Sequence, residues 1–482
     1  MQSFGLPMRH TVVVSDVHLW EALPGEGLWM RYRQRRFFPD DRLAAMLDLV
    51  ASRAGDDAIE VVFNGDVFDF DVAPVKGEGL DYESRCITED HAAARLASIL
   101  DDHPVFVAAV AKIVTRGGAV VFVAGNHDAQ LHWPKVQALL AERLVDAALG
   151  SGEPASDSRE GMRARIAFRA WFHRTVDGVL VEHGNQYDRY CSFASPLAPF
   201  VAEGQLERVE PTVGSLVVHH IVGRLGYFNP NHDPSFLLGG YGYAKHFFRY
   251  YAFAKESLVG TWSLGTIRVA LALLEHGRQR RRWDDEALAR FAVERGIDLE
   301  TLREHASMSK HAGVHEFLRT LHLDKAALAG VVVAATALAL AHPRTALGFA
   351  LGSVGALAAF NIAVKEKSLE ETYEHLRECQ RRIARLHGAR AVVFGHTHTA
   401  FGRWEEGTFY GNCGTWSPRH HDIECSVPFE RGEPFVWLRS DDTGRLRGGL
   451  YRFVDGHVFA ADEESRETLT PPAPELVAAA VA

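Results

Sequence analysis

The sequence contains few cysteines, no excess of positive charge and no apolar run near its first residue. Its 482 residues include five cysteines, an odd number, which are scattered and form no Cys-x-x-Cys pair. This pattern argues against a disulfide framework and predicts a reducing compartment. Residues 1–10 hold Arg9 and His10 but no hydrophobic stretch, so we expect no secretory signal there.

Overall charge and composition exclude further classes of protein. Lysine and arginine number 52 against 62 aspartates and glutamates, a formal net charge of −10. Nucleic acid is therefore not an expected partner, because binding through bulk positive charge needs the opposite balance. Apolar residues make up 47% and charged residues 24%, which are ordinary globular values and exclude a wholly disordered or fibrous chain.

Short apolar runs recur along the chain, and each is followed at once by polar residues. Five such runs occupy 11–14, 59–63, 119–123, 179–181 and 391–394. Their β-branched and aromatic composition predicts buried strands, and helical spacing over 41–51 and 91–100 lies between them. We therefore expect an α/β fold whose parallel strands bring polar side chains to one edge of a sheet.

The polar residues at these strand ends are of the types that hold divalent transition metals. They are Asp16, His18, Asp66, Asp69, Asn126, His127, His183, His396 and His398. Gathered at one edge, such ligands can form a two-metal centre with ions about 3.5–4 Å apart. One carboxylate must then lie between the ions to offset their repulsion, and Asp66, which follows Gly65 in a strand-to-loop turn, is the candidate.

Two of these motifs carry paired ligands. Asp16 and His18, like His396 and His398, stand at positions i and i+2. In an extended segment both side chains of such a pair point to one side. Each motif alone is also compatible with an ordinary loop, and it is the ordered set of five that predicts a metal centre.

In this order the motifs resemble those of the calcineurin-like metallophosphoesterases. The matching segments are Asp16-Val17-His18, Gly65-Asp66-Val67-Phe68-Asp69, Gly125-Asn126-His127-Asp128, His183-Gly184 and Gly395-His396-Thr397-His398. The resemblance covers roughly residues 10–190 and 385–455 and implies a four-layer α/β/β/α sandwich. It implies one ion held by Asp16, His18, Asp66 and His398, and a second held by Asp66, Asn126, His183 and His396. The ligands suit Mn, Fe, Zn or Ni, so the native metal stays open.

The resemblance also implies metal-dependent hydrolysis of a phosphate ester, either a monoester or a diester. A hydroxide activated by the ions would attack in line and expel the alcohol. His127 is next to a ligand but not needed as one, so it is the expected acid and phosphate contact. Asp69 is expected to orient His127, and Asp128 is the competing candidate.

The long interval before the last motif predicts an insertion in the core. We expect residues 1–190 and 386–466 to form the metallophosphoesterase core, 191–385 to form a helical insertion and 467–482 to be a flexible tail. A connection of about 2–6 residues would suffice between strands, so the inserted stretch should have its own structure.

The insertion contains an apolar hairpin, residues 326–364, whose two arms carry no charge. The arms would span roughly 24 and 28 Å as helices, close to the roughly 30 Å of a bilayer core. Flanking cations on one side favour a cytoplasmic protein attached to the inner face of the membrane. A buried antiparallel helix pair, packed within the protein or at an oligomer interface, is the alternative, and the oligomeric state stays open.

The preferred function is hydrolysis of a lipid-linked or amphipathic phosphoester that the insertion brings to the metals. One alternative is a UDP-diacylglucosamine-type pyrophosphatase, although those enzymes carry arginine where this chain has His127 and have a shorter lid. A second is a non-catalytic membrane-associated scaffold. A third is a soluble nuclease or cyclic-nucleotide phosphodiesterase, for which the apolar hairpin has no role.

Deletion of residues 326–364 tests the role of the hairpin. If the insertion captures lipid substrates, kcat/KM for a lipid phosphoester should fall far more than kcat/KM for soluble nitrophenyl phosphate. An equal loss on both substrates would contradict a lipid role.

Overall fold

The computed structural model describes most of the chain outside the expected insertion. The described residues are 10–55, 57–77, 79–85, 88–152, 157–203, 206–224, 226, 229, 258–276, 285–311, 373–428, 432–441 and 443–461. The expected hairpin at 326–364 and the expected tail at 467–482 lie outside them. Within the described part, no helix combines the length and apolar character needed to cross a membrane.

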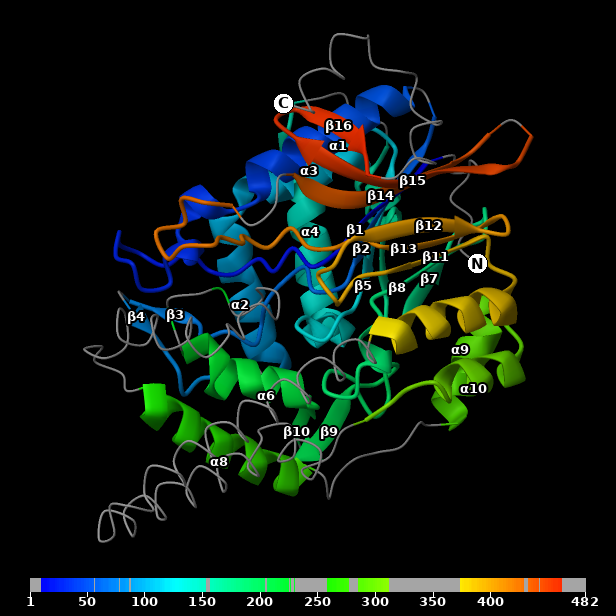
Figure 1. Ribbon diagram of the computed structural model, residues 1–482. Coiled ribbons are helices and arrows are strands. Elements are labelled where there is room, and N and C mark those ends of the chain that lie inside the picture. Colours follow the sequence, from blue (N-terminus) through cyan, green and yellow to red (C-terminus); the bar gives the residue numbers. More distant parts are fainter. Residues whose placement is uncertain are drawn as a thin grey trace, which may run out of the picture.

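The fold is mixed α/β and is built around two large sheets (Figure 1). One sheet has seven strands in the order β16-β15-β14-β1-β2-β5-β6, and the other has five in the order β12-β13-β11-β8-β7. Parallel pairing joins β1, β2, β5 and β6 in the first sheet and β8, β11 and β13 in the second. All five expected runs are strands: β1 (His10–Val14), β2 (Ile59–Asn64), β5 (Ala119–Val123), β8 (Val179–Glu182) and β11 (Ala391–Phe394).

The other strands complete these sheets or form two small hairpins. The sheets also contain β6 (Ile166–Arg169), β7 (Phe172–Arg174), β12 (Phe401–Glu405), β13 (Thr408–Asn412), β14 (Glu433–Ser440), β15 (Leu446–Val454) and β16 (His457–Ala460). The hairpins are β3 (Val75–Lys76) with β4 (Gly79–Leu80), and β9 (Phe200–Glu203) with β10 (Leu206–Val209). Short 3₁₀ turns occupy Arg31–Arg33, Arg35–Phe37, Ala129–His132, Asn185–Tyr187 and Val222–Arg224.

The central strands have unbroken apolar sequences because both of their faces are buried. Alternate residues on a strand point to opposite faces of a sheet. Val13 and Val62 therefore join residues of β8 and β11 in a core between the two sheets. Val12 and Phe63 belong instead to a core shared with the helices on the outer face of the seven-stranded sheet.

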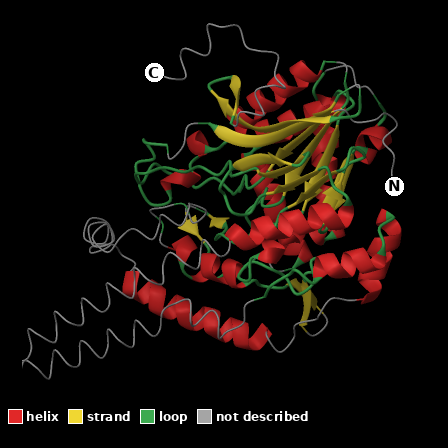
Figure 2. Cartoon of the chain, turned by 45° about the vertical axis from the view of Figure 1, so that its right-hand side comes forward, coloured by secondary structure: helices red, strands yellow, loops and turns green. Residues whose placement is uncertain are grey.

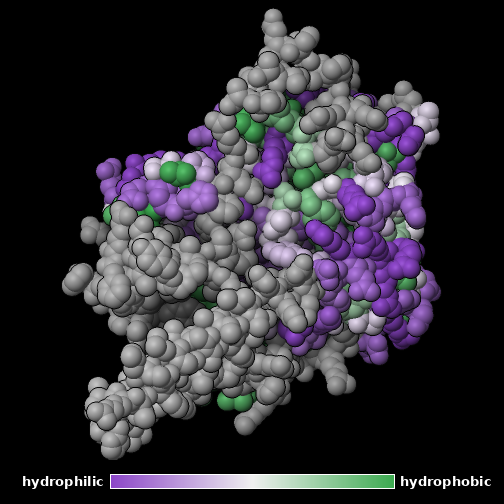
Figure 3. Space-filling view, in the orientation of Figure 1, coloured by the Kyte–Doolittle hydropathy of each residue, from purple (hydrophilic) through white to green (hydrophobic). Residues whose placement is uncertain are grey.

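Helices pack on the outer side of each sheet (Figure 2). The seven-stranded sheet is covered by α1 (Asp40–Ala54), α2 (Glu89–Asp102), α3 (Pro104–Thr115) and α4 (Pro134–Gly150), and α5 (Arg159–Ala164) precedes β6. The five-stranded sheet packs against α9 (Asp285–Arg295), α10 (Leu299–Ala306) and a helix at 373–387. The solvent-facing side of this second group is mainly hydrophilic (Figure 3).

The charged stretch near 286–304 consists of two helices, α9 and α10. Gly296 adopts a φ of 62° directly after α9, a conformation that favours glycine. The Asp298 side chain then accepts a hydrogen bond from Thr301 N and begins α10. Elsewhere in the expected insertion, α6 (Val213–His220) packs against α8 (Leu258–His276) through Leu216 and Val269.

A buried polar network anchors α10 to the five-stranded sheet. The Glu182 carboxylate at the end of β8 accepts hydrogen bonds from Trp171 Nε1 at 2.7 Å and Tyr187 Oη at 2.9 Å. His305 Nε2 of α10 lies 3.2 Å from the same carboxylate, and His305 Nδ1 lies 3.0 Å from His387 Nε2. Because these side chains are buried, each depends on the others for its polar contacts.

Substitution Glu182→Ala should lower the free energy of unfolding by about 3 kcal/mol, since buried Trp171 Nε1 loses its acceptor and the buried Tyr187–His305 pair, 2.7 Å apart, loses the carboxylate that both contact. The matched control is Glu304→Ala, which removes an exposed pair with Arg382 at 2.8 Å and should cost about 0–1 kcal/mol. Urea unfolding of both variants measures the difference. Equal midpoints would show that the network does not anchor the helix.

Candidate metal centre

The carboxyl ends of strands from both sheets meet at one place and bring the proposed ligands together. Three groups of side chains have ligand atoms that all lie within 4.8 Å of one another, a spacing that suits a metal ion. They are Asp16, His18 and His398; Asp66, His183 and His396; and His18, Asp69 and His127. Each of the first two groups contains three of the four residues expected for one ion, without Asp66 in the first group and without Asn126 in the second.

The first group joins β1 to the loop after β11. His398 Nε2 lies 3.1 Å from Asp16 Oδ1 and 3.2 Å from His18 Nε2. On its other side, His18 Nδ1 lies 3.5 Å from Asp69 Oδ2. A carboxylate behind a ligating histidine holds its ring orientation, so this geometry suits His18 as a ligand through Nε2.

The second group joins β2 to β8. His183 Nε2 lies 3.0 Å from Asp66 Oδ2, and His183 Nδ1 lies 2.8 Å from the carbonyl oxygen of Asn64. A carbonyl only accepts, so Nδ1 carries the proton, and in the neutral ring Nε2 has a lone pair for a metal. Asn126 Oδ1 is buried and has no hydrogen-bond partner among the described residues. These donor atoms therefore fit a divalent cation.

The sequence analysis expected extended backbone at the ligand pairs, and this expectation is wrong. Positive φ angles occur at Asp16 (56°), His18 (51°), Asp66 (52°), His396 (68°) and His398 (57°). The chain thus turns within each motif instead of running straight past the centre. Residues other than glycine rarely adopt this conformation, and such strain concentrates at functional sites.

Glycines in the motifs allow a close approach of the loops. A Cβ on Gly125 would lie 2.5 Å from Asp66 N, and one on Gly395 would lie 2.6 Å from Asp16 Oδ2. A Cβ on Gly65 would lie 2.5 Å from His183 Nδ1. Glycine at 65, 125 and 395 is therefore required by packing between motifs, not only by the turn itself.

The buried carboxylates make the site attractive to positive charge. Burial alone raises the pKa of Asp66, but His183 and His127 outweigh it and hold this pKa well below its ordinary value. Burial alone lowers the pKa of His183, yet Asp66 and Asp16 raise it to about 9. A divalent cation would experience the same attraction.

The surroundings of His127 differ from those expected. Its Nδ1 lies 3.1 Å from Asp71 Oδ2 and 3.5 Å from Asp69 Oδ1. Asp69 Oδ1 also accepts the backbone N–H groups of Asp71 and Val72. Asp128, the competing orienter, uses its carboxylate to accept Val67 N at 2.8 Å and Gly125 N at 2.6 Å, so it ties two loops together.

The sequence analysis missed two carboxylates, Asp71 and Asp188. Asp188 Oδ2 lies 3.0 Å from His396 Nε2, and a further group suited to a metal contains Asp188, Cys191 and His396. Bound in this way, His396 would present Nδ1 to a metal. Both aspartates lie within five residues of a motif, which is the one signal that could have indicated them.

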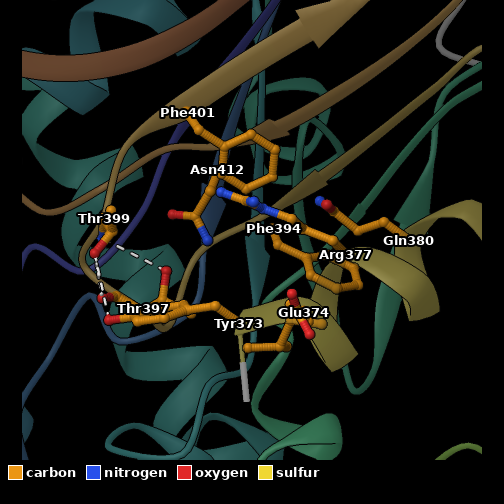
Figure 4. Close-up of a pocket in the computed structure, with 10 residues that line it drawn as sticks. Tyr373, Glu374, Arg377, Gln380, Phe394, Thr397, Thr399, Phe401 and Asn412 are labelled. Atoms are coloured by element: carbon orange, nitrogen blue, oxygen red, sulfur yellow. Dashed lines mark hydrogen bonds between the residues drawn. The ribbon is translucent and has the colours of Figure 1, made fainter. Parts of the chain in front are cut away.

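A cavity of about 450 Å³ borders the loop that carries His396 and His398. Figure 4 shows Arg377 and Gln380 of the helix at 373–387 on the side of Phe401 and Asn412, while Tyr373 extends toward Thr397 and Thr399. Gln380 Nε2 donates to Gly411 O, and Asn412 Nδ2 donates to Gly395 O. Since these amides are already paired with the backbone, the aromatic and aliphatic side chains provide most of the remaining lining.

Comparison with protein-family models and with curated proteins gives no match for this chain.

Substitution Gly125→Ala should weaken Mn²⁺ binding at least tenfold, because the added Cβ must displace Asp66. Gly150→Ala is the matched control, since a Cβ there meets nothing within 4 Å. Titration calorimetry with Mn²⁺ measures both variants, and thermal melting verifies that they are folded. Unchanged Mn²⁺ affinity in Gly125→Ala would contradict the proposed packing of the ligand loops.

Proposed function

We propose that this chain hydrolyses a phosphate ester with two divalent metal ions, as the calcineurin-like metallophosphoesterases do. The observation that carries the proposal is the convergence of five strand-end motifs, drawn from both sheets, on one buried cluster of carboxylates and imidazoles. The packing of helices on the outer side of each sheet supports the four-layer α/β/β/α sandwich that the resemblance implies.

The proposed ligands divide between the two ions as the motifs suggest. Asp16, His18 and His398 would hold one ion, and Asn126, His183 and His396 would hold the other. Asp66 would serve both. When bound, the ions would offset charge on the phosphate oxygens and supply a hydroxide at neutral pH. Mn, Fe, Zn and Ni all suit this donor set.

His127 is the proposed acid for the leaving alcohol. Asp71 and Asp69 both face its Nδ1, which leaves Nε2 as the atom that can contact the substrate. The backbone N–H of His127 donates to Asp66 Oδ1 at 2.7 Å, so the loop that carries the acid is tied to the proposed shared ligand. Asp71, being closer, is the proposed orienting carboxylate, while Asp69 also supports His18.

The proposed substrate is an amphipathic phosphoester. The cavity beside Thr397, which stands between two proposed ligands, is lined by Tyr373, Leu376, Phe394 and Phe401 and suits an apolar group. A scaffold role is less favoured, because every ligand position of the motifs is filled. Attachment to a membrane through 326–364 stays a prediction, as that segment lies outside the described residues.

Substitutions Asp66→Asn and His127→Ala test the hydrolysis. With Mn²⁺ and a chromogenic phosphodiester or monoester, each should lower kcat by about 100-fold or more, since one disturbs the metal centre and the other removes the proton donor. Metal content should fall in Asp66→Asn and stay normal in His127→Ala. The two variants thereby separate loss of metal from loss of acid.

His457→Ala is the matched control for His127→Ala, because His457 is exposed and its ring forms a local hydrogen bond with Asp455 O at 2.9 Å. Its turnover should equal that of the wild type. The proposal fails if Mn²⁺-loaded wild-type protein hydrolyses neither type of ester, or if Asp66→Asn retains full turnover and metal content.

A further inference from the structure

A second, small pocket borders the metal centre on the side of Asn126. Asp71, which contacts His127, and Asn126 form one part of its lining. The rest includes Arg85, Glu210, Ser215 and His219. Ser215 and His219 belong to α6, so the inserted region contributes directly to the surroundings of the proposed ligands.

Arg85 is the unusual residue of this pocket. Its side chain is partly buried, and among the described residues no hydrogen bond or ion pair to it is found. Burial lowers the pKa of Arg85, with Asp71 acting in the opposite direction and Arg208 in the same one. A desolvated guanidinium with unused donors is costly unless an anion pairs with it.

The carboxylates of the pocket are already engaged elsewhere. Asp71 Oδ2 lies 3.1 Å from His127 Nδ1, and Glu210 Oε2 accepts the backbone N–H of Ala194 at 2.9 Å. Burial lowers the pKa of His219, and the nearby His220 and Arg85 lower it further, to about 3. His219 is therefore close to positive charge and adds none of its own at neutral pH. The pocket therefore retains guanidinium charge that no described carboxylate pairs with directly.

We propose that Arg85 binds a second phosphate group of the substrate, in the pocket between Asn126 and α6. This inference rests on the proposed function and narrows its substrate class to phosphoesters that carry a neighbouring phosphate. The pocket is small, which suits a compact tetrahedral anion and excludes a nucleobase or an acyl chain. Guanidinium groups suit phosphate because their planar donors can engage two oxygens at once.

Two phosphonates probe the site on the full-length protein loaded with Mn²⁺. Methylphosphonate offers one anionic group, and methylenediphosphonate offers two at the spacing of a diphosphate. Titration calorimetry, corrected for Mn²⁺ chelation by each compound in buffer, gives both Kd values. Wild-type protein should bind the diphosphonate more tightly, and Arg85→Gln should reduce that preference about tenfold or more.

Arg85→Lys keeps the charge and should retain part of the preference. Arg268→Gln is the matched control, because the exposed Arg268 pairs with Glu83 at 3.3 Å and is not among the residues that line the pocket. It should leave the ratio of the two Kd values unchanged. Thermal melting verifies that all three variants are folded.

The outcomes separate this inference from the proposed function. An unchanged preference in Arg85→Gln, or equal affinity of wild-type protein for both phosphonates, overturns the second phosphate site even if hydrolysis is found. If the preference for the diphosphonate depends on Arg85 but no phosphate ester is hydrolysed, the result supports the second phosphate site and counts against hydrolysis. If neither phosphonate binds the Mn²⁺-loaded protein, the second phosphate site is overturned, whereas the hydrolysis is judged by turnover alone. Tightening of methylphosphonate binding by free inorganic phosphate, with no diphosphonate preference, would assign the pocket to a separate ion and overturn the proposal.

Discussion

A reciprocal contact between the two sheets sets the geometry of the candidate site. Asn64, the last residue of β2, donates its side-chain amide to Glu182 O at 2.9 Å, and its own carbonyl lies 2.8 Å from His183 Nδ1. These contacts join the carboxyl ends of β2 and β8, which lie in different sheets. They also orient the His183 ring, so the position of Nε2 beside Asp66 depends on how the sheets pack.

Such close packing of the loops requires strained backbone conformations and the burial of charged carboxylates. The ligands adopt left-handed conformations, and the glycines at 65, 125 and 395 leave no room for a side chain. Asp16 and Asp66 are almost fully buried within one cluster. Buried carboxylates are stable only when cations or donors surround them, which histidines do in part and which divalent ions would do more completely.

The two cavities give the proposed centre an asymmetric environment. One borders the loop of His396 and His398 and is lined largely by aromatic and aliphatic side chains, while the other borders Asn126 and contains Arg85. Helices and loops outside the sheets line much of both. We expect these connecting segments to determine which substrate binds, because the rigid sheet edge positions the proposed ligands and leaves the surrounding loops free to vary.

The sequence by itself determined the strands and the set of proposed ligands, because both are local properties. An apolar run followed by Asp, Asn or His is visible within ten residues, and all five such runs are strands. Tertiary structure alone decided which side chains face one another. The approach of His18 to His398 spans 380 residues of sequence, and the placement of Asp71 at His127 and of Asp188 at His396 depends on how loops fold over the sheet edge. The left-handed turns of the ligands and the pocket of Arg85 likewise arise from packing between distant segments, which no local pattern encodes.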